Sequence, residues 1–413
     1  MESGRGGTWI LMINRYNKDP EMARIWTDEH RFGLWLQIEN QICNEWLVED
    51  GKEPIDMLTP WTNEGDLNPL MIQRIQYYET KTGHEMTAFI SAIIDALPDD
   101  CKNVPIHKGA TSSDIMDTAL TVQMKEANTI VDRNIGKLMH ALLLKASDTA
   151  DDICLGMTHL QPAIPLTFGH RLSVFRNQLE IARDKWQRLK YPGKISGPVG
   201  TNNEINPDME GVILRHFGLE TSRGTTQVVS RVYHADIMQA MAMISSVLAT
   251  WATNFRLLST PSIGEVEEGG RSIRDGSSAM PHKHNPIKCE NIVSLSRLID
   301  AYLHIGMQNI QLWLERDLTN SANERIYIPQ AHIIINHMIV TMTKVIENLV
   351  VNNDRMWDNV QNSPEVMSAV YLSNNMSNGM TRVDAYREAK KEARTSDIVV
   401  NQKDIVELFL KNI

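Results

Sequence analysis

Apolar residues recur at helical spacing over a long stretch near the middle of this chain. From Ile237 to Leu258 they follow one another at intervals of four, three, four, three, four and three residues, and no Gly or Pro interrupts them. This spacing places the apolar side chains on one face of a helix. A helix of this length must bury that face against other long elements, so the stretch predicts one helix of a bundle.

Two further segments, 131–142 and 335–349, show the same spacing. Three long helices could therefore share a seam with a period near 3.5 residues. We see no series of strands separated by hairpin turns, no internal repeat and no glycine-rich phosphate loop. We predict an all-α subunit with little strand content and three domains: an N-terminal helical domain (1–111), a central long-helix domain (112–356) with its main loop at about 264–286, and a small C-terminal helical domain (357–413).

Composition excludes several classes of protein. The net charge of −10 and the absence of a basic stripe argue against nucleic acid as a partner. No apolar run is long enough for a membrane span, and the first residues lack the order of a secretory signal, so we expect a cytoplasmic protein. The four cysteines form no CxxC pair, and Lys283 separates His282 from His284 on a proline-flanked loop. We therefore expect no metal and no cofactor.

The segment GSSAMPHKHNP, residues 276–286, concentrates polar groups on a loop before an apolar helix. Glycines at 269, 270 and 276 would allow the loop to move as a lid. Lys283 and Asn285 could stabilise negative charge that develops on a substrate carboxylate. A polar surface loop would have a similar composition, so these residues alone do not decide between the two interpretations.

Two other segments place polar side chains beside helices. GMTHLQPA, residues 156–163, carries His159 between Thr158 and Gln161 at what we read as the start of an apolar helical run. HKGATSSD, residues 107–114, carries three hydroxyl groups and a carboxylate just before another helix. Such residues cap helices in any protein, but the amides of an exposed helix N-terminus also bind carboxylates. A structural and a functional interpretation both remain open.

These three segments resemble motifs of one enzyme family. The first matches the signature GSSxMPxKxNP of the fumarase/aspartase superfamily, the second resembles its THxQPA motif, and the third resembles the HxGxTSSD motif of the adenylosuccinate lyases. The chain resembles the adenylosuccinate lyases along nearly its whole length. This resemblance implies a carbon–nitrogen lyase that releases fumarate by β-elimination, acting on adenylosuccinate and on the succinylated carboxamide ribotide SAICAR.

The resemblance also implies roles for individual residues. Ser277 would be the general base and His159 the general acid, a role that suits imidazole because its pKa lies near neutrality. Lys283 and Asn285 would stabilise the aci-carboxylate, and Glu290 would orient the active-site histidine. The remaining residues of these motifs would bind the substrate: His107, Thr111, Ser112, Thr158 and Gln161.

Five further segments resemble the nucleotide side of the same family. Arg15 and Tyr16 open a stretch similar to RYxxPEMxxIWT, and WLERD with NSANER supplies Arg316, Ser321 and Arg325. The family uses these positions for the phosphate and nearby groups, where a guanidinium matches phosphate geometry. TGHE supplies His84, a second histidine that would contact phosphate or support the acid, and TTQVVSR supplies Gln227 as a substrate-binding residue.

The match departs from the family pattern at a few positions. Lys108 replaces a residue that is usually uncharged, and Leu314 stands where many members have His. These departures leave the nucleobase preference open, so the alternative is a related lyase that acts on a modified nucleotide, such as a 2-amino purine, or on argininosuccinate. A non-catalytic helical assembly protein is a second alternative. The resemblance further implies a homotetramer whose active sites are shared between subunits.

Overall fold

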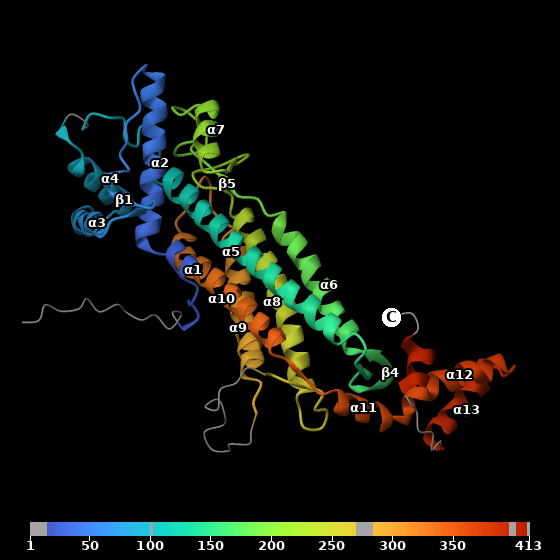
Figure 1. The fold of residues 1–413 in the computed structure, drawn as a ribbon. Coiled ribbons are helices and arrows are strands. Elements are labelled where there is room, and N and C mark those ends of the chain that lie inside the picture. Colours follow the sequence, from blue (N-terminus) through green and yellow to red (C-terminus); the bar gives the residue numbers. More distant parts are fainter. Residues whose placement is uncertain (1–14, 100–101, 270–283, 396–401, 411–413) are drawn as a thin grey trace, which may run out of the picture. The chain divides into compact units, whose positions relative to one another are not determined.

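The computed structural model describes residues 15–99, 102–269, 284–395 and 402–410 (Figure 1). Helices dominate these residues, and the strands form only two-stranded pairs, so the predicted all-α class is confirmed. The chain divides into two compact units, which we describe separately. Unit 1 comprises Met1–Arg133, Lys185–Ala242 and Leu298–His337, and unit 2 comprises Asn134–Asp184, Met243–Arg297 and Met338–Ile413.

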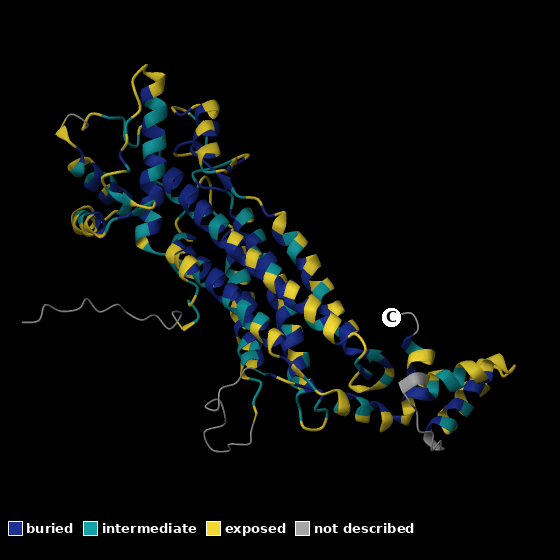
Figure 2. Ribbon diagram, in the orientation of Figure 1, coloured by how far each residue is buried: buried dark blue, intermediate teal, exposed yellow. Residues whose placement is uncertain are grey.

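Long helices contribute residues to both units. They are α5 (Ser112–Asp148), α8 (Arg231–Leu258), α9 (Ile287–Gln308) and α10 (Ser321–Glu347). Every apolar position that marked the stretches 131–142, 237–258 and 335–349 is buried, which confirms the predicted helix faces. Figure 2 shows these buried faces in dark blue, with exposed residues on the opposite sides.

The remaining elements of unit 1 begin with well-capped helices. Asp19 and Asn68 accept hydrogen bonds from the first turns of α1 and α3, and a proline follows each cap. The N-cap of α2 is Thr27, which accepts from the backbone N–H of His30. These elements are α1 (Pro20–Ile25), α2 (Asp28–Glu49), β1 (Thr62–Asn63), β2 (Asp66–Leu67), α3 (Pro69–Thr82), α4 (Glu85–Ala96), β5 (Pro192–Gly193), α7 (Pro207–His216) and β6 (Glu220–Thr221).

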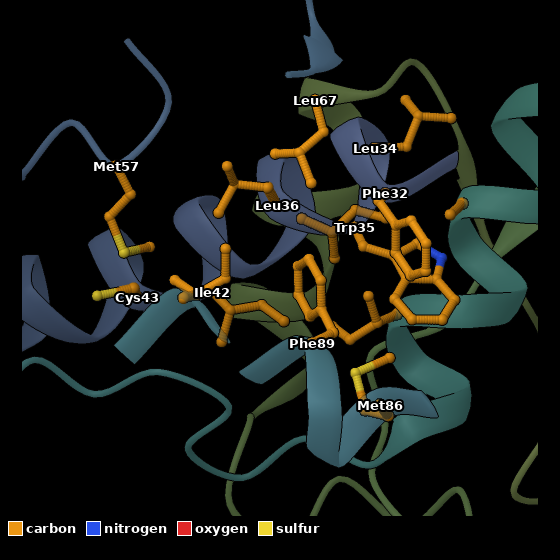
Figure 3. Packing of buried hydrophobic residues seen from close by; sticks show 14 of the residues in the cluster. Phe32, Leu34, Trp35, Leu36, Ile42, Cys43, Met57, Leu67, Met86 and Phe89 are labelled. Atoms are coloured by element: carbon orange, nitrogen blue, oxygen red, sulfur yellow. The ribbon is translucent and has the colours of Figure 1, made fainter. Parts of the chain in front are cut away.

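An aromatic cluster forms the core of unit 1 where α2 meets α4. Phe32 and Trp35 pack edge to face with ring centroids 4.9 Å apart, and Phe89 lies 5.5 Å from Trp35 (Figure 3). All three are at most 3% exposed. Burying a large aromatic side chain stabilises a fold by about 1.5–3 kcal/mol, so this cluster fixes α2 and the residues that it carries.

Unit 2 contains most of α6 and the C-terminal elements. Its core near the C-terminus joins Ile153 and Leu155 to apolar residues of the last helices, such as Val360 and Ile405. Its elements are β3 (Ile153–Thr158), β4 (Gln161–Thr167), α6 (Phe168–Gln187), β7 (Val266–Glu267), β8 (Val350–Val351), α11 (Asn353–Gln361), η3 (Pro364–Met367), α12 (Ser368–Ser377), α13 (Arg382–Thr395), α14 (Gln402–Ile405) and η4 (Val406–Leu410).

The segment 153–167 differs from the expected helical start. It forms an antiparallel hairpin in which Thr158 pairs with Gln161, and α6 begins only at Phe168. The expectation that this segment starts a helical run was therefore wrong. The sequence hides the hairpin because Pro162 and Pro165 are unusual in strands, and because no Asn-Gly or Asp-Gly pair marks the turn.

Candidate active site

Unit 1 contains a cavity of about 270 Å³ lined by polar and charged side chains. The predicted residues Arg316, Ser321 and Arg325 all line it, so the fold brings these three together. The other lining residues are Trp26, Asp28, Arg31, Trp35, Ser113, Met116, Asp117, Leu120, Gln123, Arg231, Asn320, Glu324 and Pro329.

One face of α5 forms a wall of this cavity. Ser113, Met116, Asp117, Leu120 and Gln123 recur at spacings of three and four residues, which places them on the same side of the helix. Sequence reasoning assigned the neighbouring Ser112 but missed this face. Helical spacing counted onward from the TSSD segment would have found it.

Arg316 joins three of the segments that the sequence analysis singled out. Its Nη1 donates to Ser113 Oγ at 2.7 Å and to Gln227 Oε1 at 3.0 Å. The backbone N–H of Gln227 in turn donates to the carbonyl of Glu315. Both side-chain partners are neutral, and no carboxylate among the described residues lies within ion-pair distance of Arg316. Its positive charge therefore remains available to an anion in the cavity.

Arg325 shares a carboxylate with a second arginine of the cavity. Glu85, the first residue of α4, lies 2.8 Å from Arg325 Nη2 and 2.8 Å from Arg31 Nη1. Arg31 also pairs with Asp28 at 2.9 Å. The side chain of Arg325 is 54% exposed, whereas that of Glu85 is 13% exposed. The carboxylate thus tethers an accessible guanidinium to the helix that begins after His84.

A buried ion network forms part of the cavity wall. Arg231 donates to both oxygens of Asp117, at 2.5 and 3.1 Å, and to both oxygens of Glu324, at 3.0 and 2.9 Å. Burial alone would raise the pKa of Glu324, but His234 and Arg231 lower it to about 2. The sequence analysis did not assign Arg231 to the site. The structure makes it a fixed, fully compensated charge.

Asp114 fixes the loop that carries Thr111 and Ser112. It is fully buried and forms an ion pair with the equally buried Lys194. Its carboxylate also accepts from the backbone N–H groups of Thr111, at 2.7 Å, and of Ser196. The predicted substrate-binding hydroxyls therefore lie on a backbone that a buried charge pair holds in place.

His107 and Lys108 are held by residues of α2. The imidazole Nδ1 of His107 lies 2.6 Å from Glu39 Oε1. The ammonium of Lys108 lies 3.7 Å from the centroid of the Trp46 ring, and Trp46 Nε1 donates to the carbonyl of Lys108. The unusual lysine at 108 thus stacks on an aromatic ring of its own unit.

Seven predicted residues of unit 1 lie outside the cavity lining: His107, Thr111, Ser112 and Gln227, described above, and Arg15, Tyr16 and His84. His84 is exposed and serves as the N-cap of α4, where its Nδ1 accepts from the backbone N–H of Thr87. Arg15 is exposed, and the ring of Tyr16 packs edge-on against His337 at 5.1 Å. Leu314, the second departure, is 90% exposed.

The predicted acid lies in unit 2, at the tip of the β3–β4 hairpin. His159 and Leu160 form its two-residue turn, with φ values of 55° and 58°. Two consecutive residues in the left-handed region define a turn whose twist matches a hairpin. Gly156 is required nearby, because a Cβ at this position would lie 2.2 Å from the carbonyl oxygen of Ile164. The turn exposes His159 to solvent, together with the neighbouring Thr158 and Gln161.

The predicted base lies outside the described residues, as does Lys283. Ser277 belongs to the gap between Gly269 and His284. Asn285 follows this gap and is half-buried, and Glu290 is exposed in the first turn of α9. Before the gap, the buried carboxylate of Glu268 accepts from the backbone N–H groups of Lys288 and Cys289, which ties the two ends of the signature segment together.

Two other classes of site, a metal site and a membrane-spanning helix, are not found among the described residues. No group of three or more His, Cys, Asp or Glu side chains there could hold a metal ion. In the same residues, no helix is both long enough and apolar enough to cross a membrane.

Comparison with known proteins defines the class of this chain. A sequence model of the lyase family matches residues 14–299, which is more than half of the chain, so the chain belongs to this lyase family. It is also 34% identical to the adenylosuccinate lyase of Bacillus subtilis (strain 168) over 386 residues. That alignment covers 92% of this chain and 88% of the relative. The family is thus that of the adenylosuccinate lyases, in the fumarase/aspartase superfamily.

Solved structures with a similar fold include other enzymes. The fumarate lyase of Mesorhizobium sp. BNC1 superposes with a TM-score of 0.78 at 20% identity, covering 94% of this chain and 89% of that chain. The 3-carboxy-cis,cis-muconate lactonizing enzyme of Pseudomonas putida has the same TM-score and identity and covers 97% and 91%. At this identity the likeness concerns the fold alone.

Proposed function

We propose that this chain cleaves adenylosuccinate to AMP and fumarate, and SAICAR to AICAR and fumarate. The observation that carries the proposal is Arg316, a cation in the unit 1 cavity whose hydrogen-bond partners are neutral. A guanidinium in such a site suits a phosphate. The relationship to an adenylosuccinate lyase across 92% of the chain supports the same activity.

The proposed reaction is an elimination that needs one base and one acid. Ser277 removes the proton from the succinyl carbon next to a carboxylate, and Lys283 with Asn285 stabilises the resulting aci-carboxylate. The electron pair then forms the double bond of fumarate as the carbon–nitrogen bond breaks. His159 delivers a proton to the leaving nitrogen, and Glu290 orients the active-site histidine.

The remaining predicted residues divide between the two ends of the substrate. Arg316, Ser321 and Arg325 would bind the phosphate end, together with Arg15, Tyr16 and His84. The succinyl group and the nucleobase of the substrate would be bound by His107, Thr111, Ser112, Thr158, Gln161 and Gln227. Arg316 and Gln227 contact each other, so a substrate that displaces one would reorganise the other.

A direct assay tests the activity and the specificity together. Fumarate release would be followed by absorbance with adenylosuccinate, SAICAR, a 2-amino analogue of adenylosuccinate and argininosuccinate. Turnover of the first two substrates is the expected result. Turnover restricted to the 2-amino analogue or to argininosuccinate would support the alternative substrates, and no turnover of any of them would overturn the proposed function.

The proposal includes a homotetramer with shared active sites. Apolar side chains on the long helices support self-association, because Leu143, Leu144 and Ile181 are each at least 51% exposed in the described chain. Light scattering should give four times the mass of the chain. If His159 and Ser277 serve one site from different subunits, mixing the inactive His159→Ala and Ser277→Ala proteins should restore part of the activity. A monomer, or a mixture that stays inactive, would contradict this arrangement.

A further inference from the structure

A single buried carboxylate fixes the position of His107. Glu39 lies in α2 and its side chain is 1% exposed, whereas that of His107 is 21% exposed. One oxygen of Glu39 lies 2.6 Å from His107 Nδ1, and the other accepts from the backbone N–H of His107 at 3.0 Å. The same carboxylate therefore holds both the ring and the main chain of this residue.

The backbone conformation of His107 is unfavourable, and the contacts with Glu39 help to hold it. His107 has a φ of 57°, in the left-handed region that non-glycine residues rarely adopt. The hydrogen bond from its backbone N–H to Glu39 offsets part of the cost. Thr111 lies four residues later in the same loop, and its backbone N–H donates to the carboxylate of Asp114. The loop thus presents His107 and the predicted succinyl-binding hydroxyls from one rigid backbone.

The charges around His107 favour its protonated form. Burial disfavours a charged ring, but the hydrogen bond and the charge of Glu39, and the charge of Asp114, give a net rise in the pKa of His107. Glu39 faces the ring from α2 and Asp114 from α5, where Asp114 is itself paired with Lys194. The nearby ammonium of Lys108 lies over Trp46. With Nδ1 bound to a carboxylate, Nε2 has no partner among the described residues.

We propose that Glu39 is a positioning residue, which holds His107 as an imidazolium whose Nε2–H binds a carboxylate of the succinyl group. This inference rests on the proposed function, because it needs the substrate-binding role of His107. The ring acts as the cationic donor, and Glu39 acts through it. A carboxylate at Nδ1 orients the ring and raises its basicity, as it does for histidines that bind metals, and here the raised basicity favours the protonated form.

Glu39→Gln tests the role with little change in shape. Losing a charge-assisted hydrogen bond should raise KM for adenylosuccinate about tenfold at pH 8, with kcat changing less than about twofold because no reacting atom is touched. His107 should also lose its proton at a lower pH, so the alkaline limb of kcat/KM should move to lower pH. Glu39→Asp, which keeps the charge, should restore most of the wild-type profile.

A double substitution shows whether Glu39 acts through the histidine. His107→Gln should raise KM to a similar extent and abolish the alkaline limb, and adding Glu39→Gln should have no further effect. Additive effects, or an unchanged limb in Glu39→Gln, would overturn the proposal. If Glu39→Gln does not fold, an alkaline limb that persists in His107→Gln would overturn it equally.

The matched control is a second histidine–carboxylate pair of unit 1. His30 is 4% exposed and its Nε2 lies 2.7 Å from Glu126 Oε2, but neither residue belongs to a motif to which we assign substrate binding. Glu126→Gln should therefore leave KM and the pH profile of kcat/KM unchanged. The same shift in both variants would assign the effect to general loosening of the unit. A wild-type protein without fumarate release would instead reject the proposed function, whatever the variants do.

Discussion

The two units place their predicted functional residues in opposite environments. In unit 1, the cavity of the predicted phosphate-binding residues is lined in part by Arg231, Asp117 and Glu324, a buried network whose side chains are all at most 8% exposed. In unit 2, His159 is exposed at the tip of a hairpin, in a turn of two left-handed residues. The predicted phosphate-binding residues thus lie beside a packed network of charges, whereas the predicted acid is displayed on a loop.

This difference predicts that substitutions of the buried charges affect mainly stability, whereas substitution of the exposed acid affects mainly catalysis. A buried charge can be changed only at a large cost in folding, because its partners are left unpaired in a medium of low dielectric constant. An exposed side chain in a turn contributes little to the fold, so its replacement should affect mainly the reaction. Variants in the two units should therefore differ in which property they lose.

The largest effect should come from the acid and the base. His159→Ala and Ser277→Ala should each lower kcat by about 10²–10⁴-fold, since each removes a proton-transfer group. Thermal unfolding of His159→Ala should stay close to that of the wild type, because the side chain is exposed. His140→Ala, at an exposed histidine of α5, serves as the control and should keep full activity. A kcat within twofold of the wild type in either variant would remove that residue from the mechanism.

The buried network of unit 1 should show the opposite behaviour. Arg231→Met leaves Asp117 and Glu324 buried without their cation, which should lower the free energy of unfolding by about 3–5 kcal/mol. Lys190→Met breaks a pair whose side chains are 60% and 62% exposed, and it should cost less than about 1 kcal/mol. Urea titrations of both variants make the comparison. Equal losses would mean that the network is not the stabilising feature we describe.

Acid should weaken the same network. The folded-state pKa of Glu324, about 2, lies below its ordinary value, so its contribution to stability is present above about pH 4.5 and is lost as the pH falls towards 2. Wild-type unfolding should therefore become easier in this window. In Arg231→Met this acid dependence should be smaller, because the carboxylate has lost its main cation.

The sequence predicts the bundle well because the apolar residues of a long helix recur at a regular spacing of three and four positions. The apolar positions of 237–258 are buried, and the motif residues Arg316, Ser321 and Arg325 meet in one cavity. The hairpin at 153–167 could not be predicted, because its pairing depends on contacts with residues distant in sequence, such as Val360. Its turn residues, His159 and Leu160, carry no local signal for positive φ.

Charge partners were the other part of the site that sequence could not supply. Glu39 meets His107 across 68 positions of the sequence, and Asp117 meets Arg231 across 114. Ion pairs over such distances follow from how helices pack and leave no spacing pattern. Ser113, the neutral partner of Arg316, follows the assigned Ser112 directly in the sequence and could have been included with it.

Substitution of Arg316, at the proposed phosphate end of the cavity, should have a smaller effect than the changes above. Arg316→Gln removes a cation whose partners are Ser113 and Gln227, and it should raise KM for adenylosuccinate about ten- to hundredfold. The dephosphorylated substrate should already bind the wild type more weakly by a similar factor, and the variant should show no further loss with it. If the variant weakens binding of both substrates equally, Arg316 does not contact the phosphate.

The smallest effect concerns the pH dependence of stability in unit 1. His30 lies between Asp66, 2.8 Å from Nδ1, and Glu126, 2.7 Å from Nε2. Burial opposes its charge, but the two carboxylates raise the pKa of His30 overall. A raised folded-state pKa gives stability that is complete below the unfolded value of about 6.5 and is lost as the pH rises through the folded value. Wild-type protein should become less stable across this window, whereas Glu126→Gln should show a flatter profile.

Urea titrations at several pH values above 6 measure this difference. His304→Gln, at an exposed histidine of α9, is the matched control and should follow the wild-type profile. Fumarate release by Glu126→Gln should keep its normal pH dependence, because the pair lies outside the cavity lining. A change in catalysis without a change in unfolding would show that the His30 cluster contributes to the reaction. Within unit 1, this cluster could then no longer be called purely structural.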